Sequence, residues 1–164
     1  MISTRGRYAL RVLVDLARNS SGGFVSMRDV ATRQGISPKY LEQILPALKR
    51  AGLVLSAPGR SGGYRLAKSP ESSTVAEILA LVEGPLCPVA CLEPDAKSCL
   101  RAANCPTLPM WQAYYGMTRA FFEGITLEDL ALGRPIVPMN QMKDKPEADT
   151  GEDAIPLGGT APFT

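Results

Sequence analysis

The chain has 164 residues, of which 45% are hydrophobic and 21% are charged, a composition typical of globular proteins. It contains no histidine, which excludes Ser-His and Cys-His catalytic pairs, HExxH zinc sites and histidine as a metal ligand. No apolar run approaches the ~20 residues that span a bilayer, and arginines interrupt the apolar stretch near the start, so we expect a cytoplasmic protein with no membrane partner.

Three helices are expected in the first 52 residues. Apolar side chains recur at helical spacing from Ser3 to Arg18, and a short second helix is expected from Met27 to Gln34. The pair Ser37-Pro38 favours the start of a third helix, which runs to about Ala51. Pro46 falls inside this helix and predicts a kink there or an early end, because proline removes a backbone hydrogen bond.

Two short β-prone runs, residues 53–57 and 64–66, flank a loop rich in glycine and proline and predict a hairpin. Three helices followed by a hairpin describe a winged helix-turn-helix. We therefore expect a mainly α protein with a small β-hairpin wing, in which residues 1–70 form a DNA-binding domain.

Residues 71–132 are expected to form a second region. A fourth helix spans Val75 to Glu83, residues 86–106 hold all four cysteines, and a long C-terminal helix with an aromatic stripe spans Leu108 to Gly124. Because the other elements are short, we expect this stripe to pack against a second copy of the chain, as a dimerisation helix. Residues 133–164 are rich in proline and poor in large apolar side chains, which predicts a disordered tail.

Charge is unevenly distributed along the chain. Residues 1–70 carry 12 Lys and Arg against 3 Asp and Glu, whereas residues 71–164 carry 6 against 13. A compact basic half predicts a polyanionic partner, although a solvated basic surface without a partner is the alternative.

The third helix is the expected DNA-reading element. In helix-turn-helix proteins the N-terminal part of the second helix of the pair enters the major groove. The side chains placed there, free of the apolar stripe, are Ser37, Lys39, Tyr40, Glu42 and Gln43. Arg5, Arg7 and Arg28 are expected to neutralise phosphates, and Arg60 lies at the hairpin tip, where Gly62 and Gly63 leave room for a groove.

The four cysteines are spaced Cys87-x3-Cys91-x7-Cys99-x5-Cys105. Four thiols within 19 residues of a flexible segment can wrap an iron–sulfur cluster, although no pair has the C-x2-C spacing of zinc ribbons and ferredoxins. An all-thiolate zinc site, a metal-free thiol switch and unrelated thiols remain alternatives. A thiol or iron–sulfur redox enzyme is disfavoured, because the chain has no C-x-x-C motif, phosphate-binding glycine loop or histidine.

Several segments together resemble the winged-helix repressors that include IscR and NsrR, over residues 1–132. They are Gly6-Arg7-Tyr8-Ala9-Leu10, Gly35-Ile36-Ser37, Tyr40-Leu41-Glu42-Gln43, Gly52-Leu53-Val54, Gly62-Gly63-Tyr64 and Ile125-Thr126-Leu127. The resemblance implies a homodimeric transcription regulator, not an enzyme, in which an iron–sulfur cluster modulates binding to a pseudo-palindromic double-stranded DNA operator.

By position, the resemblance places the cluster ligands at Cys91, Cys99 and Cys105 and the groove-contacting residues at Ser37, Lys39, Glu42 and Gln43. Leu108 stands where IscR-like members have a histidine, and Arg7 or Tyr8 where NsrR-like members have an aspartate. Cys87 is the economical fourth ligand, and Asp15, Glu93, Asp95 or glutathione are weaker options. Four thiolates permit a 2Fe–2S or a 4Fe–4S cluster.

Overall fold

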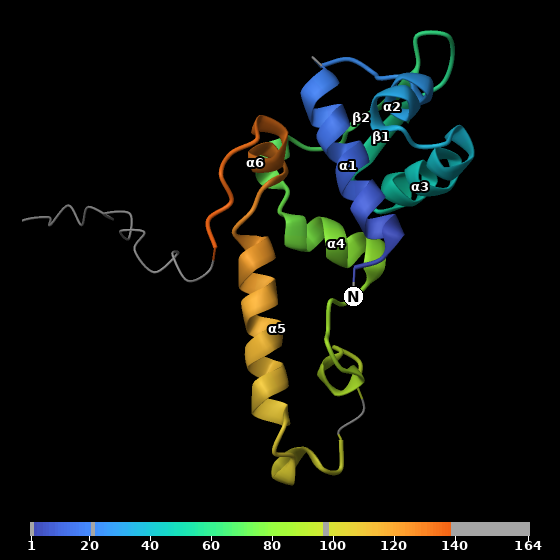
Figure 1. Cartoon of the computed structure of the whole chain (residues 1–164). Helices are drawn as coiled ribbons and strands as arrows, with labels where there is room; N and C mark the ends of the chain where they lie inside the picture. The colour runs from blue at the N-terminus through green and yellow to red at the C-terminus, as the bar shows by residue number, and fades with distance from the viewer. Residues whose placement is uncertain (1, 21, 97–98, 139–164) are drawn as a thin grey trace, which may run out of the picture.

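The computed structural model describes residues 2–20, 22–96 and 99–138. Its N-terminal part consists of three helices and a hairpin, α1 (Thr4–Asn19), α2 (Met27–Gln34), α3 (Pro38–Arg50), β1 (Val54–Ala57) and β2 (Gly63–Leu66). The strands are antiparallel and in register from Val54 opposite Leu66 to Ala57 opposite Gly63. The expected winged helix-turn-helix is confirmed (Figure 1).

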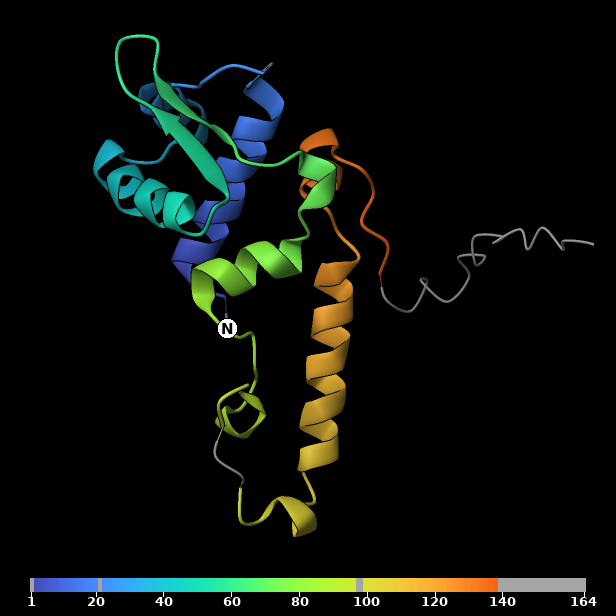
Figure 2. The same ribbon diagram turned by 180° about the vertical axis from the view of Figure 1, so that it is seen from behind.

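The chain continues through α4 (Val75–Glu83), α5 (Leu108–Glu123) and α6 (Leu127–Leu132), with short 3-10 turns at Pro70–Ser72, Ala90–Leu92 and Ala102–Asn104. We call residues 84–107, between α4 and α5, the cysteine segment. Figures 1 and 2 show that α5 and the cysteine segment extend together away from the three-helix unit. Most of the tail expected to be disordered, residues 139–164, lies outside the described residues.

Local caps set most helix ends. The Ser3 side chain accepts hydrogen bonds from the backbone amides of Arg5 and Gly6 at the start of α1. Gly35 ends α2 in the left-handed conformation, with φ of 61°, which a residue without Cβ adopts at little energetic cost.

Of the two outcomes predicted at Pro46, a kink or an early helix end, the early end does not occur, because α3 continues to Arg50. Pro46 is exposed, so water can reach the backbone carbonyl that lost its partner. Apolar side chains on the opposite face of α3, Leu41, Ile44, Leu45, Ala47 and Leu48, are buried. Burial of this face stabilises the helix by more than the ~3 kcal/mol that an internal proline costs.

Helix α1 is central to the molecule. Its Val12, Leu13 and Leu16 are fully buried and belong to a core that includes side chains of α2, α3 and β1. The same core contains three side chains from the second region, Ile78 and Val82 of α4 and Leu127 of α6. One helix therefore packs against both regions of the chain.

Hydrogen bonds also connect α6 to the rest. The Leu127 amide donates to the Ser73 carbonyl at 2.8 Å, and the Val75 amide donates to the Ile125 carbonyl at 2.8 Å. At the C-terminal end of α1, the Arg18 guanidinium donates to the carbonyls of Ala131 at 2.6 Å and Leu130 at 3.1 Å. The guanidinium thus places a cation at the C-terminal end of α6, beside the Leu130 carbonyl that also accepts from the Gly133 amide at 3.4 Å.

Candidate nucleic-acid interface and cysteine segment

The turn between α2 and α3 is built from a few local contacts. The Ile36 amide donates to the Ala31 carbonyl at 3.1 Å, and the Ile36 side chain is buried. The Ser37 hydroxyl accepts from the Tyr40 amide at 3.3 Å, and Pro38 occupies the first turn of α3. This turn fixes the angle at which the first turn of α3 leaves α2.

The first turns of α3 present polar side chains to solvent. Ser37, Lys39, Glu42 and Gln43 are exposed, as the sequence predicts, while the opposite face of the helix is buried. Tyr40 is half-buried, and its ring packs edge-on against Tyr8 of α1 at a centroid distance of 5.3 Å. The structure therefore gives Tyr40 a packing contact that sequence reasoning did not anticipate.

The four arginines expected to contact DNA are all exposed. Arg5 and Arg7 lie in the first turn of α1, Arg28 lies in α2, and Arg60 lies in the loop between β1 and β2. Among the residues that the structure describes, none of the four is within ion-pair distance of a carboxylate. Their charges are therefore available to an external anion such as a phosphate.

The glycines of the hairpin are also needed for packing within the protein itself. A Cβ on Gly63, where φ is 148°, would lie 2.1 Å from the Val25 carbonyl oxygen, and a Cβ on Gly62 would lie 2.2 Å from that of Ala57. Tyr64 and Val25 exchange backbone hydrogen bonds of 2.8 Å at this point. The absence of side chains thus serves the packing of the hairpin itself.

A buried ionic contact that sequence reasoning missed joins α1 to α2. The Asp15 carboxylate accepts a hydrogen bond from Nη2 of Arg33 at 2.7 Å and another from the side-chain amide Nε2 of Gln34 at 3.0 Å. Burial by itself raises the pKa of Asp15, but these hydrogen bonds and the Arg33 charge lower it below its usual value. Asp15 is consequently committed to this contact and is not free to ligate a cluster.

In the parts of the cysteine segment that the structure describes, residues 84–96 and 99–107, the chain forms no long helix or strand. Cys91 and Cys99 are exposed, Cys87 and Cys105 are half-buried, and all four are free thiols. The Cys87 thiol donates to the Leu92 carbonyl at 3.0 Å. Within residues 2–96 and 99–138, apart from Ser21, no three Cys, Asp or Glu side chains lie close enough together to hold a metal ion.

Two thiols have distinctive surroundings. Hydrogen bonding to the side chain and backbone of Thr107 lowers the pKa of the Cys105 thiol, because these donors favour the thiolate. The pKa of the Tyr115 hydroxyl is raised, mainly by a hydrogen bond with the Cys87 thiol and to a smaller extent by burial. Tyr115 lies on α5, so this contact joins the start of the cysteine segment to the long helix.

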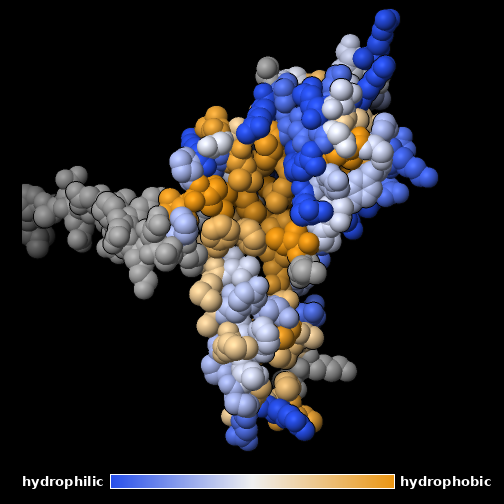
Figure 3. Space-filling view, in the orientation of Figure 1, coloured by the Kyte–Doolittle hydropathy of each residue, from blue (hydrophilic) through white to orange (hydrophobic). Residues whose placement is uncertain are grey.

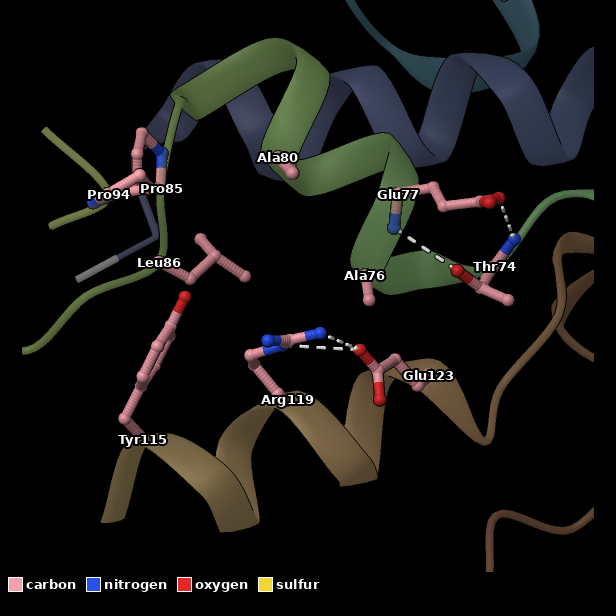
Figure 4. A pocket seen from close by; sticks show the side chains of 10 residues that line it. All are labelled: Thr74, Ala76, Glu77, Ala80, Pro85, Leu86, Pro94, Tyr115, Arg119 and Glu123. Carbon is pink, nitrogen blue, oxygen red and sulfur yellow. Dashed lines mark hydrogen bonds and ion pairs between the residues drawn. The ribbon is translucent and has the colours of Figure 1, made fainter. Parts of the chain in front are cut away.

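Helix α5 has no buried side chain, although it carries Trp, Tyr, Phe and Met. A hollow of about 520 Å³ is lined by both α4 and α5, and Figure 4 shows Tyr115 pointing from α5 toward Leu86. Figure 3 shows a continuous apolar surface over α1, α4 and α6, close to the upper end of α5. Near the C-terminal end of α5, Phe121 and Phe122 pack against Val75, Leu79 and Ile125. Further toward its N-terminal end, Met110, Tyr114 and Met117 are each more than half exposed.

The fold and the exposed face of α3 define a winged-helix DNA-binding protein. Residues 2–132 match the family model Rrf2, described as "Iron-dependent Transcriptional regulator". The chain therefore belongs to the Rrf2 family of transcriptional regulators; it binds DNA and is not an enzyme. Among the described residues, no helix has the length and apolar character needed to cross a membrane.

Similar proteins come from several bacteria. Protein rrf2 of Nitratidesulfovibrio vulgaris is 37% identical over 151 residues, covering 90% of this chain and 97% of that protein. The regulator IscR of Citrobacter koseri is 32% identical over 157 residues, covering 94% and 95%. The structure of CymR, the global cysteine regulator of Bacillus subtilis, superposes with a TM-score of 0.66 at 33% identity, covering 82% and 98%.

Proposed function

We propose that the protein binds a double-stranded operator as a homodimer and that the cysteine segment senses iron–sulfur, redox or nitrosative status. In this division of labour, residues 1–70 bind DNA, residues 71–132 sense and dimerise, and residues 133–164 form a tail outside both. The observation that carries the DNA-binding part is the exposed first turn of α3, whose opposite face is buried.

In the proposed complex, Ser37, Lys39, Glu42 and Gln43 lie at base edges in the major groove. Lysine suits guanine or phosphate, glutamine suits adenine, and glutamate accepts from the cytosine amino group. Tyr40, whose ring packs against Tyr8, orients this turn of α3 beside the DNA. Phosphate contacts come from Arg5, Arg7 and Arg28, with Arg60 of the hairpin at the adjoining groove.

The homodimer rests on α5, a 16-residue helix with no buried side chain. Met110, Tyr114 and Met117 are each more than half exposed, which is unfavourable for apolar groups in water. Packing of α5 against a second copy buries them and sets two α3 helices about one DNA turn apart, ~34 Å. Sedimentation at micromolar concentration measures this, and a monomer contradicts it.

The cysteine segment offers a donor set that suits iron and sulfide. Its four thiols are free, two are exposed, and Cys105 is the more readily ionised because of Thr107. Cys91, Cys99 and Cys105 would hold an iron–sulfur cluster, with Cys87 as the fourth ligand. When bound, the cluster supplies iron and sulfide that react with oxidants and nitric oxide.

The chain's own contribution is to deliver thiolates from a segment with few backbone restraints. The described thiols do not converge, so ligation requires residues 84–107 to rearrange between α4 and α5. Because α4 precedes this segment and α5 follows it, a change in its conformation changes the position of α5 relative to the DNA-binding unit. A cluster regulates DNA affinity only by its free-energy difference between the two arrangements.

A metal-free thiol switch is the second candidate, because two of the thiols, Cys91 and Cys99, are exposed and accessible to an oxidant. Oxidation of two such thiols to a disulfide, by a peroxide or disulfide oxidant, would constrain the same segment.

Anaerobic purification followed by an absorption spectrum and iron, sulfide and zinc analysis separates the candidates. A brown protein with iron and sulfide supports the cluster, a colourless protein with zinc supports a thiolate zinc site, and a metal-free protein supports the thiol switch. Replacement of Cys91, Cys99 or Cys105 by Ala is expected to abolish the visible absorbance. If all three variants keep it, the ligand assignment is wrong.

A further inference from the structure

A carboxylate from α4 reaches the N-terminal turn of α1. Oε1 of Glu83 accepts hydrogen bonds from the Ser3 amide at 3.2 Å, the Ser3 hydroxyl at 2.6 Å and the Gly6 amide at 2.7 Å. The first amides of a helix have no partner within the helix and carry partial positive charge, so a carboxylate there is stabilising. The contact joins residues 77 to 80 positions apart in sequence.

Gly6 makes the room for this contact. A Cβ at Gly6 would lie 2.2 Å from Oε1 of Glu83, and the three nearest atoms to it all belong to the Glu83 side chain. Any larger residue at this position displaces the carboxylate. The approach therefore depends on one glycine in α1 and one glutamate in α4.

The contact stands between the two parts of the proposed switch. Glu83 is the last residue of α4, and Gly84, with φ of 86°, begins the cysteine segment, with Cys87 four residues beyond Glu83. On the other side, Gly6 lies between Arg5 and Arg7, the exposed arginines of the first turn of α1. The Glu83 side chain thus connects the start of the cysteine segment to the turn of α1 that carries the two arginines.

Displacement of the cysteine segment has a direct route to this carboxylate. The core side chains Ile78 and Val82 hold α4 against α1 as far as Val82 in its last turn, whereas the next residue, Glu83, is only half-buried and ends the helix. The last turn of a helix frays more readily than its middle. A pull on Gly84 therefore withdraws Glu83 before it displaces the core.

We propose that Glu83 is a positioning residue that couples the cysteine segment to the N-terminal turn of α1, and so to the DNA contacts of Arg5 and Arg7. This inference rests on the proposed function, in which the cysteine segment regulates DNA binding. With Glu83 in place the arginines are held in one arrangement, and with Glu83 withdrawn the turn of α1 loosens and DNA affinity falls.

The test measures how strongly the cysteines influence DNA affinity in each Glu83 variant. The probe is a duplex selected by the wild-type protein from a randomised pool. Its Kd is measured anaerobically for the full chain and for the triple variant Cys91→Ser/Cys99→Ser/Cys105→Ser. We define the cysteine effect as the larger of these two Kd values divided by the smaller. An effect of about fivefold or more is expected, within the usual range of allosteric coupling.

Three substitutions are then compared in both backgrounds. Glu83→Leu is expected to reduce the cysteine effect to about onefold, because it has no acceptor, whereas Glu83→Gln keeps most of it, since an amide oxygen accepts the same hydrogen bonds. Glu77→Leu is the matched control, because Glu77 caps the other end of α4 on Thr74 and does not touch α1. It should leave the cysteine effect unchanged.

The outcomes separate the two hypotheses. If the wild-type protein shows no cysteine effect, the proposed sensing function fails and the coupling fails with it. If the wild-type effect is present and survives in Glu83→Leu, the coupling role of Glu83 is refuted while the sensing function stands. Should Glu83→Leu not fold, Gly6→Ala displaces the same carboxylate without changing α4, and an undiminished cysteine effect in that variant overturns the proposal.

Discussion

The buried ion pair between α1 and α2 allows a quantitative prediction about the stability of the DNA-binding unit. The Asp15 side chain is 2% exposed and the Arg33 side chain is 37% exposed. Removing the carboxylate leaves a guanidinium that can turn into water, whereas removing the guanidinium leaves a buried carboxylate. The two partners of one ion pair should therefore differ in the effect of their loss.

Asp15→Asn keeps the shape of the side chain and exchanges charge-assisted hydrogen bonds for neutral ones, so we expect it to reduce the free energy of unfolding by ~1–2 kcal/mol. Arg33→Gln leaves the Asp15 carboxylate in a desolvated site with Gln34 as its remaining strong donor. Because an uncompensated buried charge is the more costly defect, we expect a loss of ~3 kcal/mol at pH 7.

The pH dependence of the two proteins has opposite sign. In the wild type the pKa of Asp15 lies below its ordinary value of 3.8, so the stabilisation is present above that value and is lost as pH falls through the folded-state pKa. In Arg33→Gln, burial dominates and raises the pKa of Asp15. The folded protein then binds a proton more tightly than the unfolded chain, and this variant regains stability as pH falls from 7 toward about 5.

Urea unfolding monitored by circular dichroism at pH 7 and pH 5, at one fixed protein concentration, measures these differences. The reasoning is refuted if Asp15→Asn is the more destabilised variant at pH 7. It is also refuted if the deficit of Arg33→Gln relative to wild type is the same at both pH values.

Further outcomes follow from other contacts. Arg5→Ala should weaken binding to all duplex sequences and flatten the salt dependence of binding, whereas Glu42→Gln should change the base preference. Binding titrations at several salt concentrations measure both effects, and the reverse pattern contradicts the placement of α3. Brief treatment with iodoacetamide at neutral pH, followed by peptide mass spectrometry, should modify Cys105 faster than Cys99, and Thr107→Val should remove that difference, because Thr107 lowers the pKa of the Cys105 thiol. Hydrogen bonds from Thr126 and Arg134 lower the pKa of Asp129 from 3.8 to about 2, so the stability advantage of wild type over Asp129→Asn should shrink as pH falls from 4 to 2.

Much of the fold was predictable because its signals are local. Ser37 with Pro38 marks the start of α3, Gly35 marks the end of α2, and the apolar spacing identifies the buried faces, since these effects act within one helical turn. Of the kink or early end predicted at Pro46, the early end does not occur, because tertiary burial of the opposite face outweighs the local backbone defect. The exposed reading face of α3 followed from the same periodicity.

The order of residues along the chain thus determined the helices, the hairpin and the polar side of α3, because each depends on neighbours within a few positions. Only the tertiary structure decided that Arg33 neutralises Asp15 and that Gly63 clears the Val25 backbone. It alone brought Glu83 to Gly6 across 77 positions. Such contacts depend on how helices approach one another in space, a property that no local pattern of residues encodes.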